Sequence, residues 1–214
     1  RLNPVKAITS TALLNLAIIS TAAAAPVQWS SGSGANNHWY EFVVLGSADP
    51  SLTASQAEAL AASSSFMGQG GYLATITSAA EQTFLNSIWP GAGSISGQFN
   101  AFSFFLIGAT DRNTEGSFEW LGGPEGGHPL AYTNWSAGEP NNFQANNGED
   151  YVVAWWQDSL SGSWNDIPDN SDIRGYLVEY SVTPVPIPAA LPHHIGGLGL
   201  LGLAVSRPRG ATHA

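Results

Sequence analysis

Cysteine is absent from this chain of 214 residues. Disulfide bonds are therefore excluded, although small exported domains commonly depend on them. The fold must be held by its hydrophobic core and by any bound metal ion, because binding to the folded state alone adds to its stability. Eight Trp, nine Phe and six Tyr residues supply large apolar side chains for such a core.

Positive charge is also scarce. The chain has six Lys and Arg residues against sixteen Asp and Glu, which gives a net charge of −10. Between residues 26 and 192 only Arg112 and Arg174 are basic, and every acidic residue lies between residues 41 and 179. A surface of this sign repels phosphate backbones, so we expect no nucleic-acid partner. Cations and neutral ligands such as sugars remain compatible with it.

The motifs of common hydrolases are missing too. The sequence contains no Gly-x-Ser-x-Gly, no His-Glu-x-x-His and no cysteine nucleophile. We expect His38 at the edge of a strand, because no second histidine stands at metal-ligand spacing, and His128 in a loop. Every histidine lies away from the acidic segment described below. These absences predict a binding domain and not an enzyme.

The apolar segments at the two ends are shorter than the roughly 18 residues that a membrane-spanning helix needs. Residues 1–25 combine a basic start at Arg1 and Lys6, an apolar stretch at 12–19 and small residues at 22–25. This order is typical of a secretory signal peptide, and we expect cleavage after Ala24. The chain is therefore expected to be exported, with its folded domain at residues 26–182.

Residues 183–214 form a tail of different composition. A Pro-rich stretch at 185–192 precedes an apolar Gly/Leu run of 11 residues at 195–205, and Arg207 and Arg209 follow. The tail resembles the PEP-CTERM sorting signal of Gram-negative bacteria, which an exosortase recognises and removes. The resemblance implies a protein that is secreted or held at the cell envelope or surface. His193 and His194 interrupt a position that is apolar in such signals, so a disordered Pro/Gly tail is the alternative.

Local patterns predict two helices and several strands. Thr53 with Gln56, and Ser78 with Glu81, have the spacing of N-terminal capping boxes, and Pro90 ends the second helix. Aromatic and β-branched residues predict strands at 38–44, 72–76, 104–110, 118–121, 152–156 and 176–180. The segment at 104–110 is almost wholly apolar, as expected of a strand buried on both faces.

Oxygen-bearing side chains are concentrated between residues 139 and 166, where no Lys or Arg occurs. The segment contains Glu139-Pro140-Asn141-Asn142, Asn146-Asn147-Gly148-Glu149-Asp150 and Trp164-Asn165-Asp166. Ca²⁺ takes about 6–8 oxygen ligands of this kind, and without a cation or solvent such a loop repels itself. X-Pro bonds readily become cis, and a cis bond at Pro140 would turn the side chains of Glu139 and Asn141 to one side. Composition leaves two interpretations open, a calcium site and a solvated polar turn.

The motifs Glu-Pro-Asn, Gly-Glu-Asp and Trp-Asn-Asp follow one another along the chain. Taken in this order, they resemble the calcium site of C-type lectins that bind mannose-type sugars. Upstream, residues 105–111 and 115–120 resemble the central strand of the same family and the segment after it. Residues 71–76, followed by Glu81, Phe84 and Leu85, resemble its second helix region. The resemblance covers about residues 38–180. It implies an α+β, C-type lectin-like fold in which two helices flank small antiparallel sheets and a long loop region binds calcium.

The resemblance implies five ligands for one Ca²⁺: Glu139, Asn141, Glu149, Asn165 and Asp166. Two neighbouring hydroxyls of a mannose- or glucose-type sugar would complete the coordination. Each hydroxyl would donate a hydrogen bond to a carboxylate and accept one from an amide, Glu139 acting with Asn165 and Glu149 with Asn141. In the family, Glu-Pro-Asn goes with mannose or glucose and Gln-Pro-Asp with galactose.

An auxiliary calcium site is implied beside the first, held by Asp111, Glu115, Asn142 and Asp150, with Glu149 shared. Asn142 stands where an Asp is common, which removes one charge and is expected to weaken the site. A turn with solvated acids is the alternative here.

The chain departs from the family where Tyr151 and Val178 occupy positions that normally carry cysteine. Its loops at 139–149 and 149–165 are also somewhat longer than in compact members, so the sugar preference is less determined than the ligand set. A second function stays open, a structural or protein-binding domain in which calcium only stabilises the loop.

Overall fold

The computed structural model describes residues 21–23, 25–46, 49–89, 104–143, 148–156 and 162–181. The chain divides into one unit at Arg1–Thr183 and a second at Pro184–Ala214. The first 20 residues and the tail from residue 182 lie outside the described residues, so the signal segment at 1–25 and the sorting tail at 183–214 stay predictions. In the described part of the chain, no helix is both long and apolar enough to cross a membrane.

The described structure consists of ten strands and two helices. The helices are α1 (Ala54–Ser63) and α2 (Ala79–Ile88). The strands are β1 (Thr21–Ala23), β2 (Val27–Gln28), β3 (Trp39–Leu45), β4 (Ser65–Phe66), β5 (Gln69–Leu73), β6 (Phe104–Thr110), β7 (Glu119–Trp120), β8 (Tyr151–Trp155), β9 (Ser163–Ile167) and β10 (Gly175–Tyr180). β1 lies inside the predicted signal segment.

Both helices begin where the sequence predicts. Thr53 caps α1 with a complete capping box, in which its hydroxyl accepts from Gln56 N at 3.2 Å and the Gln56 side chain accepts from Thr53 N at 3.0 Å. The box predicted at α2 is only half formed. Ser78 Oγ accepts from Glu81 N at 3.1 Å, but the Glu81 carboxylate accepts from Thr77 N at 2.7 Å instead of from Ser78. Glu81 is only 1% exposed, so its carboxylate lies inside the protein and does not cap the N-terminus of α2.

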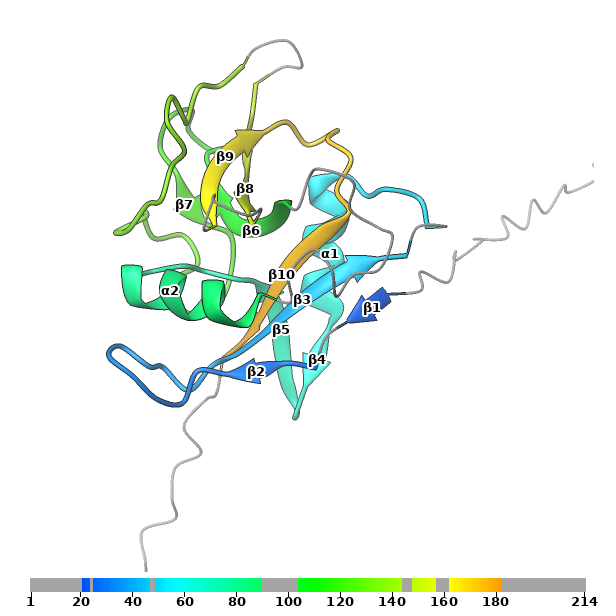
Figure 1. Cartoon of the computed structure of the whole chain (residues 1–214). Helices are drawn as coiled ribbons and strands as arrows, with labels where there is room; N and C mark the ends of the chain where they lie inside the picture. The colour runs from blue at the N-terminus through cyan, green and yellow to red at the C-terminus, as the bar shows by residue number, and fades with distance from the viewer. Residues whose placement is uncertain are drawn as a thin grey trace, which may run out of the picture. The chain divides into compact units, whose positions relative to one another are not determined.

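The strands form one sheet with the order β1-β3-β10-β6-β8-β9 (Figure 1). Along this order, neighbours are antiparallel except β10 and β6, which are parallel. β2 pairs with β3, β5 pairs with β10 and β4, and β7 pairs with β6. The small antiparallel sheets of the expected fold therefore join into one mixed sheet, because β10 pairs with β3, β5 and β6 at once.

The two helices cover opposite faces of this sheet. Phe42 and Val44 of β3 pack in the same core as Leu85 of α2. Val43 and Leu45 pack in a second core, which contains the buried alanines of α1: Ala54, Ala57 and Ala61. Neighbouring side chains of a strand point to opposite faces, so the two cores lie on the two sides of the sheet. β6 is buried on both faces, as its composition predicts.

Candidate functional site

The end of the sheet gathers acids that are far apart in the sequence. Thr110, the last residue of β6, pairs with Tyr151, the first of β8, and Tyr151 pairs with Ile167, the last of β9. Asp111 follows Thr110 and Asp150 precedes Tyr151, so both lie at this end of the sheet, and Asp166 lies one residue inside β9, where it pairs with Val152. A hydrogen bond from Thr110 Oγ1 to the Asp150 carbonyl, at 2.5 Å, joins two of the chain segments directly.

Asp166 holds the Glu-Pro-Asn segment. Its Oδ1 accepts from Asn141 N at 3.1 Å and its Oδ2 from Asn142 N at 2.8 Å. The Glu139–Pro140 peptide bond is cis, an isomer that X-Pro bonds readily adopt. Glu139 N donates to Ser136 O at 3.0 Å. Asp166, which is 1% exposed, thus fixes the backbone of two of the implied ligands.

Glu149 closes the other side of this segment. Its Oε2 accepts from Phe143 N at 2.8 Å, and its own N–H donates to Asn142 Oδ1 at 3.0 Å. Asn165 Nδ2 donates to the Asp166 carbonyl at 2.6 Å, which leaves the Asn165 amide oxygen available as a ligand. The five implied primary ligands are therefore brought to one region by β9 and by the two ends of the long loop.

The electrostatics of this region suit a cation. Burial, together with the nearby Asp166 and then Glu149, raises the pKa of Glu139 above its ordinary value. Burial and Asp166 likewise raise the pKa of Glu149, although the Phe143 N–H opposes the shift. Glu139 Oε2 is buried with no hydrogen-bond partner among the described residues. A divalent cation would relieve both the repulsion and the unmet acceptor.

Carboxylates alone do not complete a site. Within the described ranges, no three His, Cys, Asp or Glu side chains form a group that could hold a metal ion. Ca²⁺ would therefore need the amide oxygens of Asn141 and Asn165 as well, and such a mixture of carboxylate and amide oxygens is usual for Ca²⁺. Asn146 and Asn147 of the long loop lie outside the described residues.

The residues of the implied auxiliary site also converge. A Cβ built on Gly148 would lie 3.1 Å from Asn142 Oδ1, 3.9 Å from Glu115 Oε2 and 4.0 Å from Asp150 Oδ1. Gly148 has φ +96°, a conformation that favours glycine. Asp111 Oδ2 accepts from the N–H of residue 116 at 2.8 Å. Its Oδ1 is buried with no partner in the described structure.

Within this auxiliary group, the carboxyl group of Asp111 has a raised pKa. Burial raises its pKa to about 6, against the lowering effect of the Gly116 N–H, and the charges of Glu115 and Asp150 raise it further. The group thus shares with the primary region a buried carboxylate oxygen that lacks a partner.

One feature of the region escaped sequence reasoning. Phe143 is 67% exposed beside the implied ligands, and an aromatic side chain within a polar run was the available signal. Trp164 packs edge-on against Trp135, with ring centroids 5.6 Å apart. Trp135 in turn packs against Phe118 at 4.9 Å. Trp164 belongs to the core that also contains Leu85 of α2, and Trp135 and Phe118 pack against this core.

Comparison with known proteins bears on the fold and the family. Halomucin from Haloquadratum walsbyi is 35% identical over 154 residues, which are 68% of this chain but only 1% of halomucin. The C-type lectin CEL-I from Cucumaria echinata superposes with a TM-score of 0.53 at 26% identity, over 74% of this chain and 98% of CEL-I. The EPNH mutant of CEL-I gives the same TM-score at 27% identity, over 74% and 97% of the two chains.

The chain thus spans a very small part of the one curated relative named here, and nearly the whole of the two solved structures. The α+β fold expected from the sequence is the fold observed. Residues 52–175 match the family model described as the lectin C-type domain. The chain belongs to the C-type lectin domain family.

Proposed function

We propose that this domain binds carbohydrate in a calcium-dependent manner and prefers mannose- and glucose-type sugars. The observation that carries the proposal is the Glu139 carboxylate, which lies within the electrostatic influence of Asp166 and Glu149 and has one buried oxygen without a partner in the described structure. Membership of the C-type lectin family supports carbohydrate binding in general terms. The domain of this family is typically a binding domain, in line with the expectation that the chain is not an enzyme.

In the proposed site the ligands are Glu139, Asn141, Glu149, Asn165 and Asp166. Bound Ca²⁺ would supply coordination for two neighbouring sugar hydroxyls. Glu139 and Glu149 each accept a hydrogen bond from one hydroxyl, and Asn165 and Asn141 each donate one. An amide nitrogen has two N–H donors, so Asn165 keeps one for the sugar while the other is bound to the Asp166 carbonyl.

A second calcium ion is proposed at Asp111, Glu115, Asn142 and Asp150, with Glu149 shared. These residues belong to the turn after β6 and to the two ends of the long loop. Holding them together would fix the shape of the sugar-binding segment, because Asn142 also accepts from Glu149 N. Asn142 would contribute a neutral ligand, so we expect calcium to bind more weakly here than at the primary site.

The alternative function is a protein-binding or structural domain in which calcium only stabilises the loop. The exposed Phe143 is the observation that favours it, since exposed aromatic side chains are common in protein interfaces. Sugar binding and protein binding predict different results in the experiment below.

The experiment is a glycan array probed with the full chain in the presence of calcium and again with a chelator. The expected result is signal on mannose- and glucose-terminated glycans that disappears with the chelator. Signal that survives the chelator, or no signal on any glycan by a calcium-loaded and folded protein, contradicts the proposal. Affinity for single sugars is expected to be weak, because a sugar held by two hydroxyls buries little surface.

Export is also proposed, from residues 1–25 and 183–214. We infer that the protein is secreted or held at the cell envelope or surface of a Gram-negative bacterium, and that an exosortase-type enzyme removes the tail. Mass spectrometry of the exported protein tests this. An intact C-terminus ending in Thr212-His213-Ala214 would contradict processing.

A further inference from the structure

A second cluster of ionisable side chains lies outside the proposed site. Two carboxylates, Glu81 of α2 and Glu179 of β10, are each 1% exposed. Tyr40 of β3 lies between them, and its hydroxyl donates to Glu81 Oε1 and lies 3.3 Å from Glu179 Oε1. His38 completes the cluster, with Nδ1 2.5 Å from Glu179 Oε1.

The segment between β5 and α2 fixes both carboxylates in place. Glu179 Oε2 accepts from Thr75 N at 3.0 Å and from Thr75 Oγ1 at 3.1 Å. Glu81 Oε2 accepts from Thr77 N at 2.7 Å and from Thr77 Oγ1 at 2.8 Å. Neither carboxylate can turn toward solvent without breaking these hydrogen bonds.

His38 is the only side chain that brings positive charge to the cluster from within the described ranges. Arg112 pairs with Glu58 at 2.9 Å, and Arg174 donates to the Asp49 carbonyl at 2.7 Å. The ionisable groups that face His38 or its partner Glu179 come from five elements: Glu179 itself (β10), Glu81 (α2), Glu125 (the loop after β7), Tyr40 (β3) and Tyr72 (β5).

These surroundings favour a bound proton. Burial by itself would lower the pKa of His38, but its hydrogen bond with Glu179 and the charges of Glu179, Glu125 and Glu81 raise it above the ordinary 6.5. Burial, and then the charge of Glu179, raises the pKa of Glu81. Burial also raises the pKa of the Tyr40 hydroxyl far above its usual range, so this residue stays neutral.

The cluster lies at the end of a loop that packs on α2. Residues 29–38, here called the Trp29 loop, are closed by hydrogen bonds from Trp29 N to His38 O at 3.0 Å and from Asn37 N to Trp29 O at 2.9 Å. The Trp29 ring stacks on Phe84 of α2, with centroids 5.5 Å apart and an interplanar angle of 13°. Asn36 Nδ2 donates to Glu81 Oε1 at 3.4 Å.

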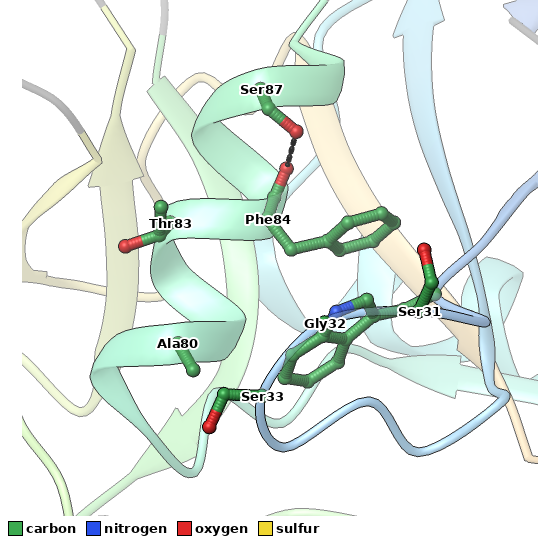
Figure 2. Close-up of a pocket in the computed structure, with 8 residues that line it drawn as sticks. Ser31, Gly32, Ser33, Ala80, Thr83, Phe84 and Ser87 are labelled. Atoms are coloured by element: carbon green, nitrogen blue, oxygen red, sulfur yellow. Dashed lines mark hydrogen bonds between the residues drawn. The ribbon is translucent and has the colours of Figure 1, made fainter.

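A cavity of about 380 Å³ separates part of this loop from α2. Ser31, Gly32 and Ser33 line it from the loop, and Ala80, Phe84 and other residues line it from the helix (Figure 2). The packing between loop and helix is therefore incomplete, and the loop depends on the contacts of Trp29 and on the His38 cluster.

We propose that the cluster is a proton-dependent latch for the Trp29 loop. With His38 protonated, the loop is held against α2 and β10. With His38 neutral, Glu179 loses its cation while it still faces Glu81 inside the protein, and the loop opens. The reason is that a buried charge left without its partner is strongly destabilising.

Protonation of His38 stabilises the closed latch, so the stability of the latch depends on pH. A histidine with a raised pKa contributes stability that is complete below its ordinary value and is lost as the pH rises through its folded value. Glu81, also raised, acts in the same direction. The latch is thus closed in mildly acidic solution and weakened in alkaline solution.

Hydrogen exchange of the full chain with saturating calcium tests the proposal, since calcium keeps the acidic loops in one state. Exchange of a peptide covering residues 29–38 is compared at pH 5.5 and pH 8, after correction for the intrinsic effect of pH on exchange. Protection of this peptide should fall about tenfold for each unit by which the His38 pKa exceeds its ordinary value. A peptide from β6 should show no such fall.

Variants make the test specific. His38→Gln should leave the loop as open at pH 5.5 as the wild type is at pH 8, and His128→Gln, which changes an exposed loop histidine, should behave as the wild type. Wild-type protection that is independent of pH, or an unchanged fall in His38→Gln, overturns the proposal. If His38→Gln does not fold, Glu81→Gln serves instead. This variant removes one buried charge, and loop protection at pH 8 no higher than wild type would overturn the latch equally.

Discussion

Glu139 and Asn141 offer different hydrogen bonds to a sugar hydroxyl, because a carboxylate only accepts whereas an amide nitrogen donates. Exchanging the two chemistries, Glu139→Gln with Asn141→Asp, keeps the net charge and the number of oxygen ligands. We expect the double variant to keep calcium binding and to lose binding of mannose-type sugars. Titration calorimetry with calcium and then with methyl mannoside measures both. Retained mannose binding would show that the longer loops set the preference instead.

Asp166 combines two roles, as an implied ligand and as the acceptor of the Asn141 and Asn142 N–H groups. A ligand that binds only the folded state at 100 times its dissociation constant stabilises that state by about 2.7 kcal/mol. Calcium should therefore raise the melting temperature of the wild type, and Asp166→Asn should remove most of that rise. Asp172→Asn is the matched control, since Asp172 is exposed and bonds to the Ser51 hydroxyl at 2.7 Å. An undiminished calcium response in Asp166→Asn would contradict the primary site.

At the scale of elements, β6 passes unusually close to the chain that leaves β5. A Cβ on Gly108 would lie 2.4 Å from Leu73 O, and Gly108 N donates to Ala74 O at 2.9 Å. Gly108→Ala should therefore force the two segments apart and destabilise the domain by about 1–3 kcal/mol, measured by urea unfolding. Gly70→Ala in β5, where nothing lies within 4 Å of the added Cβ, should have a much smaller effect. Equal losses in the two variants would rule out the steric explanation.

The elements show where sequence reasoning succeeds. α1 and α2 could be predicted because their caps are local, with Thr53 and Ser78 each accepting from the residue three positions later. β9 could not be predicted in this way, because its sequence Ser-Trp-Asn-Asp-Ile is largely polar. It becomes a strand through its pairing with β8. Glu81 also departs from its predicted capping role, because its side chain is buried in the fold.

For the candidate site, the sequence proposes a set of residues but not their arrangement. The order of three short motifs identified the implied ligands, because those motifs carry the chemistry in the chain itself. The bonds from the Asn141 and Asn142 backbone to Asp166 span 25 and 24 residues, and the contact between His38 and Glu179 spans 141. Partners at such separations are set by strand pairing, which local patterns do not reveal.

At the scale of the whole molecule, several acids share one direction of pKa shift. Asp111, Glu139, Glu149 and Glu81 all have raised values, and that of Asp111 reaches about 6. An acid with a raised pKa is most stabilising below its unfolded value, and this contribution is lost as the pH rises through the folded value. The metal-free domain should therefore become less stable between about pH 4 and pH 7, where Asp111 loses its proton, and the raised pKa values of the other three acids act in the same direction.

Urea unfolding of dialysed, metal-free protein across this range measures the effect, and repeating it with calcium is the control. Calcium binds the ionised carboxylates, so its stabilisation should grow as the pH rises. Metal-free protein whose stability rises steadily from pH 4 to pH 7 would contradict the repulsion inferred among these acids.

The pairing of β2 and β10 with the two edges of β3 bears on how such a domain can be inserted into a longer protein. Val27 of β2 and Glu179 of β10 pair with the same residue, Tyr40, from opposite sides. Paired strands lie about 4.8 Å apart, so the backbones at residues 27 and 179, near the start and the end of the folded domain, lie within about 10 Å of each other. A unit with adjoining ends is portable, since it can be spliced into a surface loop of a host without stretching either polypeptide.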